Sequence, residues 1–110
     1  MGELHDAEAL HSRLVAEGER YAEFLHRPAM SAGVYRLTAG ESDRQSPHAE
    51  DEVYVVLSGR AMLRSGDADF PVAEGSVAFV PGREEHGFHD VIDDLLVVAI
   101  FAPAEGRGAR

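Results

Sequence analysis

The sequence predicts an all-β domain, a closed antiparallel barrel or sandwich preceded by one short N-terminal helix. After Gly18 the hydrophobic pattern changes from a helical period to short apolar runs that are separated by turn residues. Regular spacing of such runs over about 90 residues is typical of barrels and sandwiches. The predicted strands are Tyr21–Leu25, Ser31–Leu37, Val53–Leu57, Ala61–Arg64, Asp69–Val72, Ser76–Val80, Gly87–Val91 and Leu95–Phe101.

The N-terminal helix is predicted over residues 6–17, because Asp6 can cap its start and Gly18 can end it. Its apolar face is formed by Leu10, Leu14 and Val15. The last residues contain Gly and Arg and are typical of a flexible chain end. We therefore expect a helical segment, a barrel and a flexible tail, at residues 1–19, 20–103 and 104–110.

The composition restricts the possible partners. The chain has 20 acidic and 10 basic residues and a net charge of −10, which argues against nucleic acid or an anionic membrane surface as partner and favours cations. It has no cysteine, so a metal would be held by His, Asp, Glu and water. Neither a secretory leader nor an apolar run of roughly 18 residues is present, so we expect a cytoplasmic protein.

Residues 46–59 combine metal-capable side chains with an apolar strand. In one extended strand the Cα atoms of His48 and Glu52 would lie roughly 13 Å apart, too far to share an ion at bonds of about 2.0–2.2 Å. A shared metal therefore requires a bend at residues 49–51, which are small and polar. Glu50 would lie on this bend and is expected to face solvent.

Residues 75–90 repeat this design, with an apolar strand, a Pro81-Gly82 turn and then His86. Strand alternation places His86, Phe88 and Asp90 on one face and Gly87 and His89 on the other. If His86 faces the barrel interior, His89 faces away from it. The sequence therefore favours His86 over His89 as a metal ligand.

Together the two stretches resemble the cupin superfamily. Its first motif runs Gly, five residues, His-x-His, three or four residues, Glu, six residues, Gly. Its second motif runs Gly, five residues, Pro-x-Gly, two residues, His, three residues, Asn. The matching positions are His48, Glu52, Gly59, Gly75, Pro81 and His86. The departures are Ser46 for the first His, Arg83 for the second-motif Gly and Asp90 for the final Asn.

The resemblance implies a double-stranded β-helix, which is a jelly-roll barrel, with one divalent transition metal inside it. By position, the metal ligands would be His48, Glu52 and His86. Two imidazoles and a carboxylate leave open coordination positions and suit Fe(II), Zn(II), Mn(II), Ni(II) or Cu(II). No organic cofactor is expected. Glu50 and Ser46 are further candidates for completing the metal shell.

The predicted pocket is small and mostly apolar. Tyr54 and Val56 share the face of Glu52, Phe88 shares the face of His86, and Tyr35 can add a second hydroxyl from a neighbouring strand. Such a lining suits a small organic ligand. Three other large apolar residues are assigned to the core: Met30, Phe79 and Phe101.

Three functions are compatible with these residues. The resemblance favours a metal-dependent oxidoreductase of the dioxygenase kind, with Tyr54 or Tyr35 as proton donor or orienting group. The second is a non-catalytic module that binds metal or a small molecule. The third is a metal-free structural barrel, in which Glu52 would pair with Arg36 or Arg64. Since cupins often dimerise and Tyr21–Leu25 is predicted at a sheet edge, a homodimer is expected.

Overall fold

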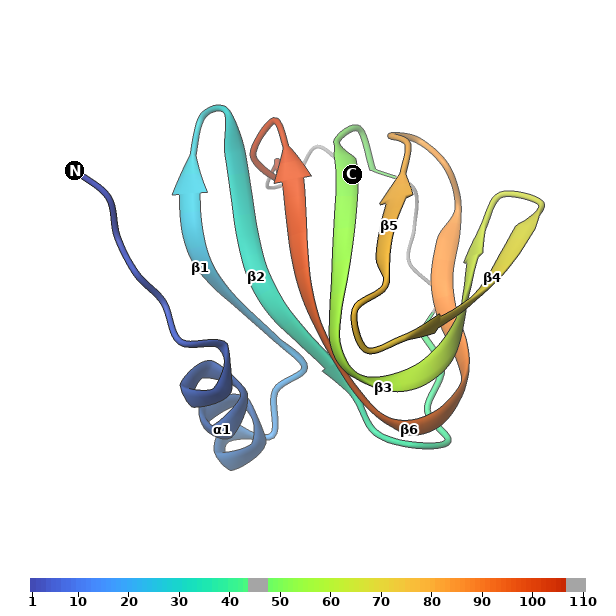
Figure 1. Cartoon of the computed structure of the whole chain (residues 1–110). Helices are drawn as coiled ribbons and strands as arrows, with labels where there is room; N and C mark the ends of the chain where they lie inside the picture. Colours follow the sequence, from blue (N-terminus) through green and yellow to red (C-terminus); the bar gives the residue numbers. More distant parts are fainter. Residues whose placement is uncertain (44–47, 107–110) are drawn as a thin grey trace.

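The computed structural model of the chain describes residues 1–43 and 48–106, in which one helix precedes a six-stranded antiparallel sheet (Figure 1). This confirms the predicted all-β class with a short N-terminal helix. The elements are α1 (Ala7–Glu17), β1 (Tyr21–Arg27), β2 (Met30–Leu37), β3 (Asp51–Ser65), β4 (Ala68–Ala73), β5 (Val77–Val80) and β6 (His86–Ala102).

The strands follow the order β1-β2-β6-β3-β4, and β5 pairs with β3 next to β4. The two longest strands, β3 and β6, are paired along most of their length and curve together, so that the sheet folds over on itself (Figure 1). Among the described strands, β1 lies at one edge of the sheet, as expected for the segment that we predict to pair with a second copy. The homodimer itself stays a prediction.

Two predicted chain breaks are bends within long strands. Ser58-Gly59 lies inside β3, and Asp93-Asp94 lies opposite it in β6, where the pairing register shifts. Gly59 has a φ of 95°, and a Cβ atom there would lie 2.3 Å from the carbonyl oxygen of Asp94. Glycine therefore allows the two backbones to approach closely at the bend. For this reason the predicted strands Val53–Leu57 and Ala61–Arg64 form the single strand β3. Likewise Gly87–Val91 and Leu95–Phe101 form the single strand β6.

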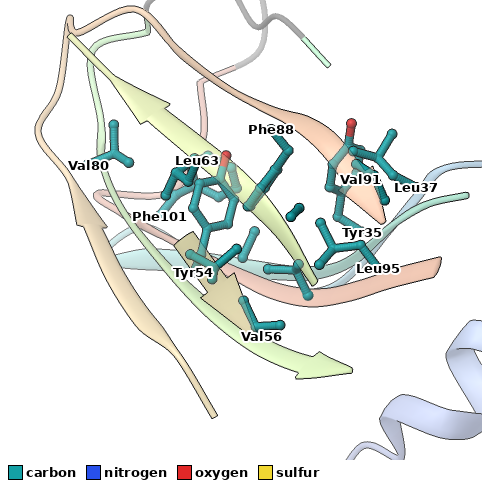
Figure 2. Close-up of a cluster of buried hydrophobic side chains, with 14 residues drawn as sticks. Tyr35, Leu37, Tyr54, Val56, Leu63, Val80, Phe88, Val91, Leu95 and Phe101 are labelled. Carbon is teal, nitrogen blue, oxygen red and sulfur yellow. The ribbon is translucent and has the colours of Figure 1, made fainter. Parts of the chain in front are cut away.

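The interior side chains of the folded sheet form one apolar cluster, part of which is labelled in Figure 2. Tyr54 and Val56 point inward from β3, as strand alternation predicts, and Phe88 points inward from β6. Phe101 is buried as predicted. Met30 and Phe79, which we assigned to the core, are 37% and 59% exposed. Met30 lies at the exposed start of β2, and on β5 the inward position belongs to Val80.

A second, smaller apolar cluster lies under α1 on the outer side of the sheet. Asp6 caps the helix by accepting from the backbone N–H groups of Glu8 and Ala9, and Gly18 ends it, as predicted. Leu14 is buried against Val34 and Leu96, whereas Val15 is exposed, so the buried face is narrower than predicted. Within residues 1–43 and 48–106, no helix has both the length and the apolar character that a membrane span requires.

The bend can be tested by comparing Gly59→Ala with Gly75→Ala. Both glycines have a positive φ, but a Cβ at Gly75 would meet no atom within 4 Å. Each substitution should therefore cost roughly 1–2 kcal/mol for the left-handed backbone. Gly59→Ala should cost about 1–3 kcal/mol more, because its methyl group collides with the backbone of β6. Urea unfolding followed by circular dichroism measures the difference, and equal losses would contradict the close approach.

Candidate metal centre

Three side chains from separate parts of the chain converge inside one end of the folded sheet. His48 precedes β3, Glu52 is the second residue of β3, and His86 is the first residue of β6. Oε1 of Glu52 lies 3.2 Å from Nε2 of His48 and 3.1 Å from Nε2 of His86. The side chains of all three are at most 2% exposed. The structure thus brings together the three ligands that the motifs predict.

The bend in β3 creates this convergence. His86 pairs with Ser65 at the far end of β3, yet it contacts Glu52 near the start of the same strand. If β3 were straight, these thirteen steps would span about 40 Å. The turn of the sheet at Gly59 brings the two ends of β3 close together. The site therefore depends on the fold more than on any local sequence.

The predicted bend between His48 and Glu52 is present at Ala49 and Glu50. The turn after β5 holds it, because Arg83 N–H donates to the carbonyl of His48 at 2.6 Å and Gly82 N–H donates to Oδ1 of Asp51 at 2.8 Å. A Cβ at Gly82 would lie 2.3 Å from the carbonyl oxygen of Ala49. Gly82 is therefore needed for close packing, while Arg83 takes the left-handed conformation, with a φ of 68°.

Each histidine has a partner behind the ring. Nδ1 of His86 lies 3.0 Å from the backbone carbonyl of Glu84, and Nδ1 of His48 lies 3.4 Å from Oε1 of Glu50. Metal-binding histidines commonly donate their second ring N–H to a carbonyl or carboxylate in this way. Glu50 was expected to face solvent, and this prediction is wrong, because the residue is only 4% exposed. The bend turns its side chain inward behind His48.

The donor atoms fit a metal ion. Nε2 of His48, Nε2 of His86 and Oε1 of Glu52 are buried and make no hydrogen bond within the part of the chain that the structure describes. Metal bonds of about 2.1 Å at angles near 90–110° would separate neighbouring donor atoms by about 3.0–3.4 Å. The two observed separations lie in this range. Burial of three polar groups without partners is costly unless a cation satisfies them.

The electrostatics also favour a cation. Burial raises the pKa of the Glu52 carboxyl, but the nearby imidazoles of His48 and His86 outweigh it and bring the pKa below its usual value. Burial lowers the pKa of His86, while Glu52 and the Glu84 carbonyl outweigh burial and bring this pKa above its usual value. Glu52 is therefore a carboxylate at neutral pH, and it attracts positive charge to the interior.

The alternative in which Glu52 pairs with an arginine differs from the observed contacts. Arg36 donates to the backbone carbonyl of Glu19, and Arg64 lies 3.8 Å from Asp69. The Glu52 carboxylate instead lies 3.2 Å from the imidazole of His48 and 3.1 Å from that of His86. Ser46, the other candidate for the metal shell, lies outside the described residues.

The two predicted phenols are buried near the ligand group. Tyr54 packs against Phe88, with ring centroids 4.9 Å apart, and its ring centroid is 6.1 Å from that of His86. Tyr35 stacks against the other side of Phe88 at 6.4 Å. In Figure 2 the hydroxyl oxygens of both tyrosines point toward the same side of the apolar cluster. Tyr54 is therefore the phenol closer to the candidate ligands.

Both phenols hold their protons more tightly than usual. Burial, then the charge of Glu52 and a hydrogen bond with it, raises the pKa of Tyr54 well above its usual value. Burial, then Asp43, raises the pKa of Tyr35. At neutral pH each hydroxyl is therefore a hydrogen-bond donor and not a phenolate.

The predicted inward and outward orientations of the residues after His86 are only partly correct. His89 lies outside the site and contacts Asp69 at 2.8 Å and Asp90 at 3.1 Å, as expected for a non-ligand. Asp90, which we placed on the inward face, is exposed. Its φ of 48° interrupts the strand alternation after His89.

A cavity of about 280 Å³ adjoins the site, and His86, Phe88, Asp43 and Arg64 contribute to its lining. His86 thus belongs to both the cavity and the candidate ligand group. The charged lining residues Asp43 and Arg64 are not among the pocket residues that strand alternation predicted. Asp43 was missed because it lies between the predicted strands Ser31–Leu37 and Val53–Leu57. Only the fold brings it beside Phe88, whose carbonyl accepts from the backbone N–H of Asp43 at 2.8 Å.

The ligand assignment can be tested with His86→Ala and its matched control His89→Ala. The first substitution removes a buried donor atom and should abolish binding of a divalent metal and the thermal stabilisation that binding provides. The second removes a histidine of the same strand that also lines the cavity but contacts Asp69 and Asp90 instead of the ligand group, and it should leave binding within about twofold of wild type. Calorimetric titration of metal-free protein measures both. Loss of binding only in His89→Ala would show that the inward assignment is wrong.

The pKa directions of the tyrosines predict the alkaline behaviour. Because the folded state raises the pKa of Tyr35 and Tyr54 above the unfolded value of about 10, their contribution to stability is fully present below about pH 10 and declines as pH rises through the folded values. Absorbance titration should show late ionisation, with one late-ionising group fewer in Tyr54→Phe and in Tyr35→Phe. Ionisation of every phenol near pH 10 in folded protein would contradict this.

Comparison with known proteins agrees with the two motifs. The cupin domain family matches residues 33–101. Uncharacterized protein SCO3923 of Streptomyces coelicolor is 45% identical over 96 residues, which cover 87% of this chain and 91% of that protein.

Solved structures show the same architecture. TT1209 from Thermus thermophilus has a TM-score of 0.75 and 25% identity, over 94% of this chain and 99% of that chain. A Klebsiella pneumoniae protein with a double-stranded β-helix domain has a TM-score of 0.75 and 17% identity, over 94% of this chain and 91% of that chain. With its folded antiparallel sheet and both motifs, the chain belongs to the cupin family.

Proposed function

We propose that this protein is a mononuclear metal-dependent cupin that acts on a small organic substrate as a dioxygenase-like oxidoreductase. One observation carries the metal part of the proposal: two imidazole nitrogens and one carboxylate oxygen are all buried, with the oxygen 3.1 and 3.2 Å from the nitrogens, and they make no hydrogen bond to any residue of 1–43 or 48–106. His48, Glu52 and His86 would hold the ion. Bound there, Fe(II) would supply the open coordination positions on which oxygenase chemistry depends.

The residues around the ligands support a small substrate. The ring of Phe101 lies 5.4 Å from that of His48, and Phe88 lines the adjoining cavity together with His86. This cavity of about 280 Å³ lies just below the usual range for ligand pockets. Phe88 is the large apolar residue of the lining, and most of the other lining side chains are polar or charged. Asp43 and Arg64, which also line the cavity, would orient a substrate with polar groups at one end.

Tyr54 is the better candidate for the proton donor or orienting group. Its hydroxyl is protonated, and a hydrogen bond joins it to Glu52, so that it lies beside the ligand set. Tyr35 interacts with Asp43 and lies beyond Phe88. In this proposal Tyr54 positions the carboxylate of Glu52 and offers a proton to substrate bound nearby, while Tyr35 shapes the wall of the pocket.

Metal content tests the first part of the proposal. Protein purified without a histidine tag or chelators should contain about one equivalent of a divalent transition metal, and added metal should raise its melting temperature. Less than about 0.1 equivalent, together with no gain in melting temperature for Fe(II), Zn(II), Mn(II), Ni(II) or Cu(II), would support a metal-free structural barrel.

Oxygen consumption tests the second part. The Fe(II)-loaded protein should consume oxygen with at least one member of a panel of small phenols, thiols and diketones. Tyr54→Phe should lower kcat by about 100-fold, because it removes the proton at the ligand set, and Tyr35→Phe should have a smaller effect. Tight metal binding without turnover would instead favour a non-catalytic binding module, a function that the replacement of the first motif His by Ser46 also suits.

A further inference from the structure

Glu50 is a buried carboxylate that the metal ligand set does not use. It is 4% exposed, although it lies on the bend immediately before β3. Burying a carboxylate is costly unless each oxygen finds a donor or a positive charge. Oε1 of Glu50 faces Nδ1 of His48 at 3.4 Å, and among the described residues neither atom makes a hydrogen bond; Oε2 accepts from the backbone N–H of Gly106 at 3.1 Å. The carboxylate thus connects His48 with the C-terminal segment.

The C-terminal segment after β6 is tied to the sheet by successive backbone donors. Ala104 N–H donates to the carbonyl of Pro28 at 3.3 Å, and Glu105 N–H donates to Oγ of Ser31, which is fully buried, at 2.8 Å. Gly106 N–H then reaches Glu50. The segment that we predicted as a flexible tail therefore begins with three hydrogen-bonded residues, while residues 107–110 lie outside the described part.

The position of Glu50 decides which nitrogen of His48 can bind metal. A neutral imidazole carries one proton, and only the bare nitrogen can coordinate an ion. A carboxylate behind Nδ1 holds the proton there and leaves Nε2 free to face Glu52. The backbone carbonyl of Glu84 can hold the proton on Nδ1 of His86 in the same way. His48 lies before β3 and outside any strand, and the group behind its ring is the side chain of Glu50.

We propose that Glu50 is a positioning residue for His48 and that the C-terminal segment 103–106 holds Glu50 in place through the Gly106 N–H. The metal affinity of the site thereby depends on the end of the chain. This inference rests on the proposed metal-binding function.

The test uses Co(II) as probe, because its affinity can be measured by calorimetry and its coordination by visible absorption. Full-length metal-free protein is compared with Glu50→Gln and with Glu74→Gln, which removes the same charge from an exposed turn. Glu50→Gln should weaken Co(II) binding about 10- to 100-fold and change the visible spectrum, whereas Glu74→Gln should stay within about twofold of wild type.

A matched pair of substitutions tests the C-terminal segment. Gly106→Pro removes the backbone donor and should weaken Co(II) binding about tenfold, whereas Gly106→Ala keeps the donor and should not. Since both residues act through His48, the double variant Glu50→Gln with Gly106→Pro should bind no more weakly than Glu50→Gln alone. Additive losses in the double variant would overturn the connection.

Two further measurements separate positioning from a general loss of stability. Nitrogen NMR should show His48 of the wild type protonated at Nδ1, and Glu50→Gln should populate both tautomers. The melting temperature of metal-free Glu50→Gln should be unchanged or higher, because a buried charge is removed. Folded Glu50→Gln with wild-type Co(II) affinity would overturn this inference alone. No Co(II) binding by the wild type would overturn the proposed function as well.

Discussion

The close approach of β3 and β6 at Gly59 is the constraint on which the rest of the structure depends. At this point the backbone of β3 passes so near Asp94 that a side chain would not fit. The register shifts around it let both long strands bend together. The bend closes the apolar cluster of Tyr54, Phe88 and Leu63 and also brings His86 back to Glu52. The close approach at Gly59 thus shapes both the apolar core and the candidate metal centre.

The buried polar groups of the site stabilise one another. Glu52 and Glu50 both lie in the protein interior, where an unpaired carboxylate is strongly unfavourable. Each is close to His48, and Glu52 is also close to His86. A cation between the Nε2 atoms and Glu52 would complete this set, whereas a purely apolar barrel would have no use for four buried polar side chains. His48, Glu52 and His86 thus form a group that could hold a metal ion.

Local patterns in the sequence predict local structure well and long-range structure poorly. Asp6 and Gly18 mark the ends of α1, and the spacing from Glu52 to Gly59 and from Pro81 to His86 identifies both motifs. The sequence does not show that Ser58-Gly59 is a bend and not a chain break, because that depends on Asp94 in another strand. Likewise the burial of Glu50 depends on Gly106, and the exposure of Asp90 depends on a positive φ. Contacts between distant segments decide the first two outcomes, and a local backbone conformation decides the third.

The two histidines of the site are supported in different ways, and this difference bears on how a cupin site can vary. His86 begins a strand and has a backbone carbonyl behind its ring, so its orientation follows from the fold. His48 is held instead by the Arg83 N–H, the ring of Phe101 and the carboxylate of Glu50. Contacts from three segments of the chain therefore orient His48. With Ser46 in place of a second histidine, the motifs supply three candidate ligands, and in our proposal the binding strength would depend on how firmly His48 is held.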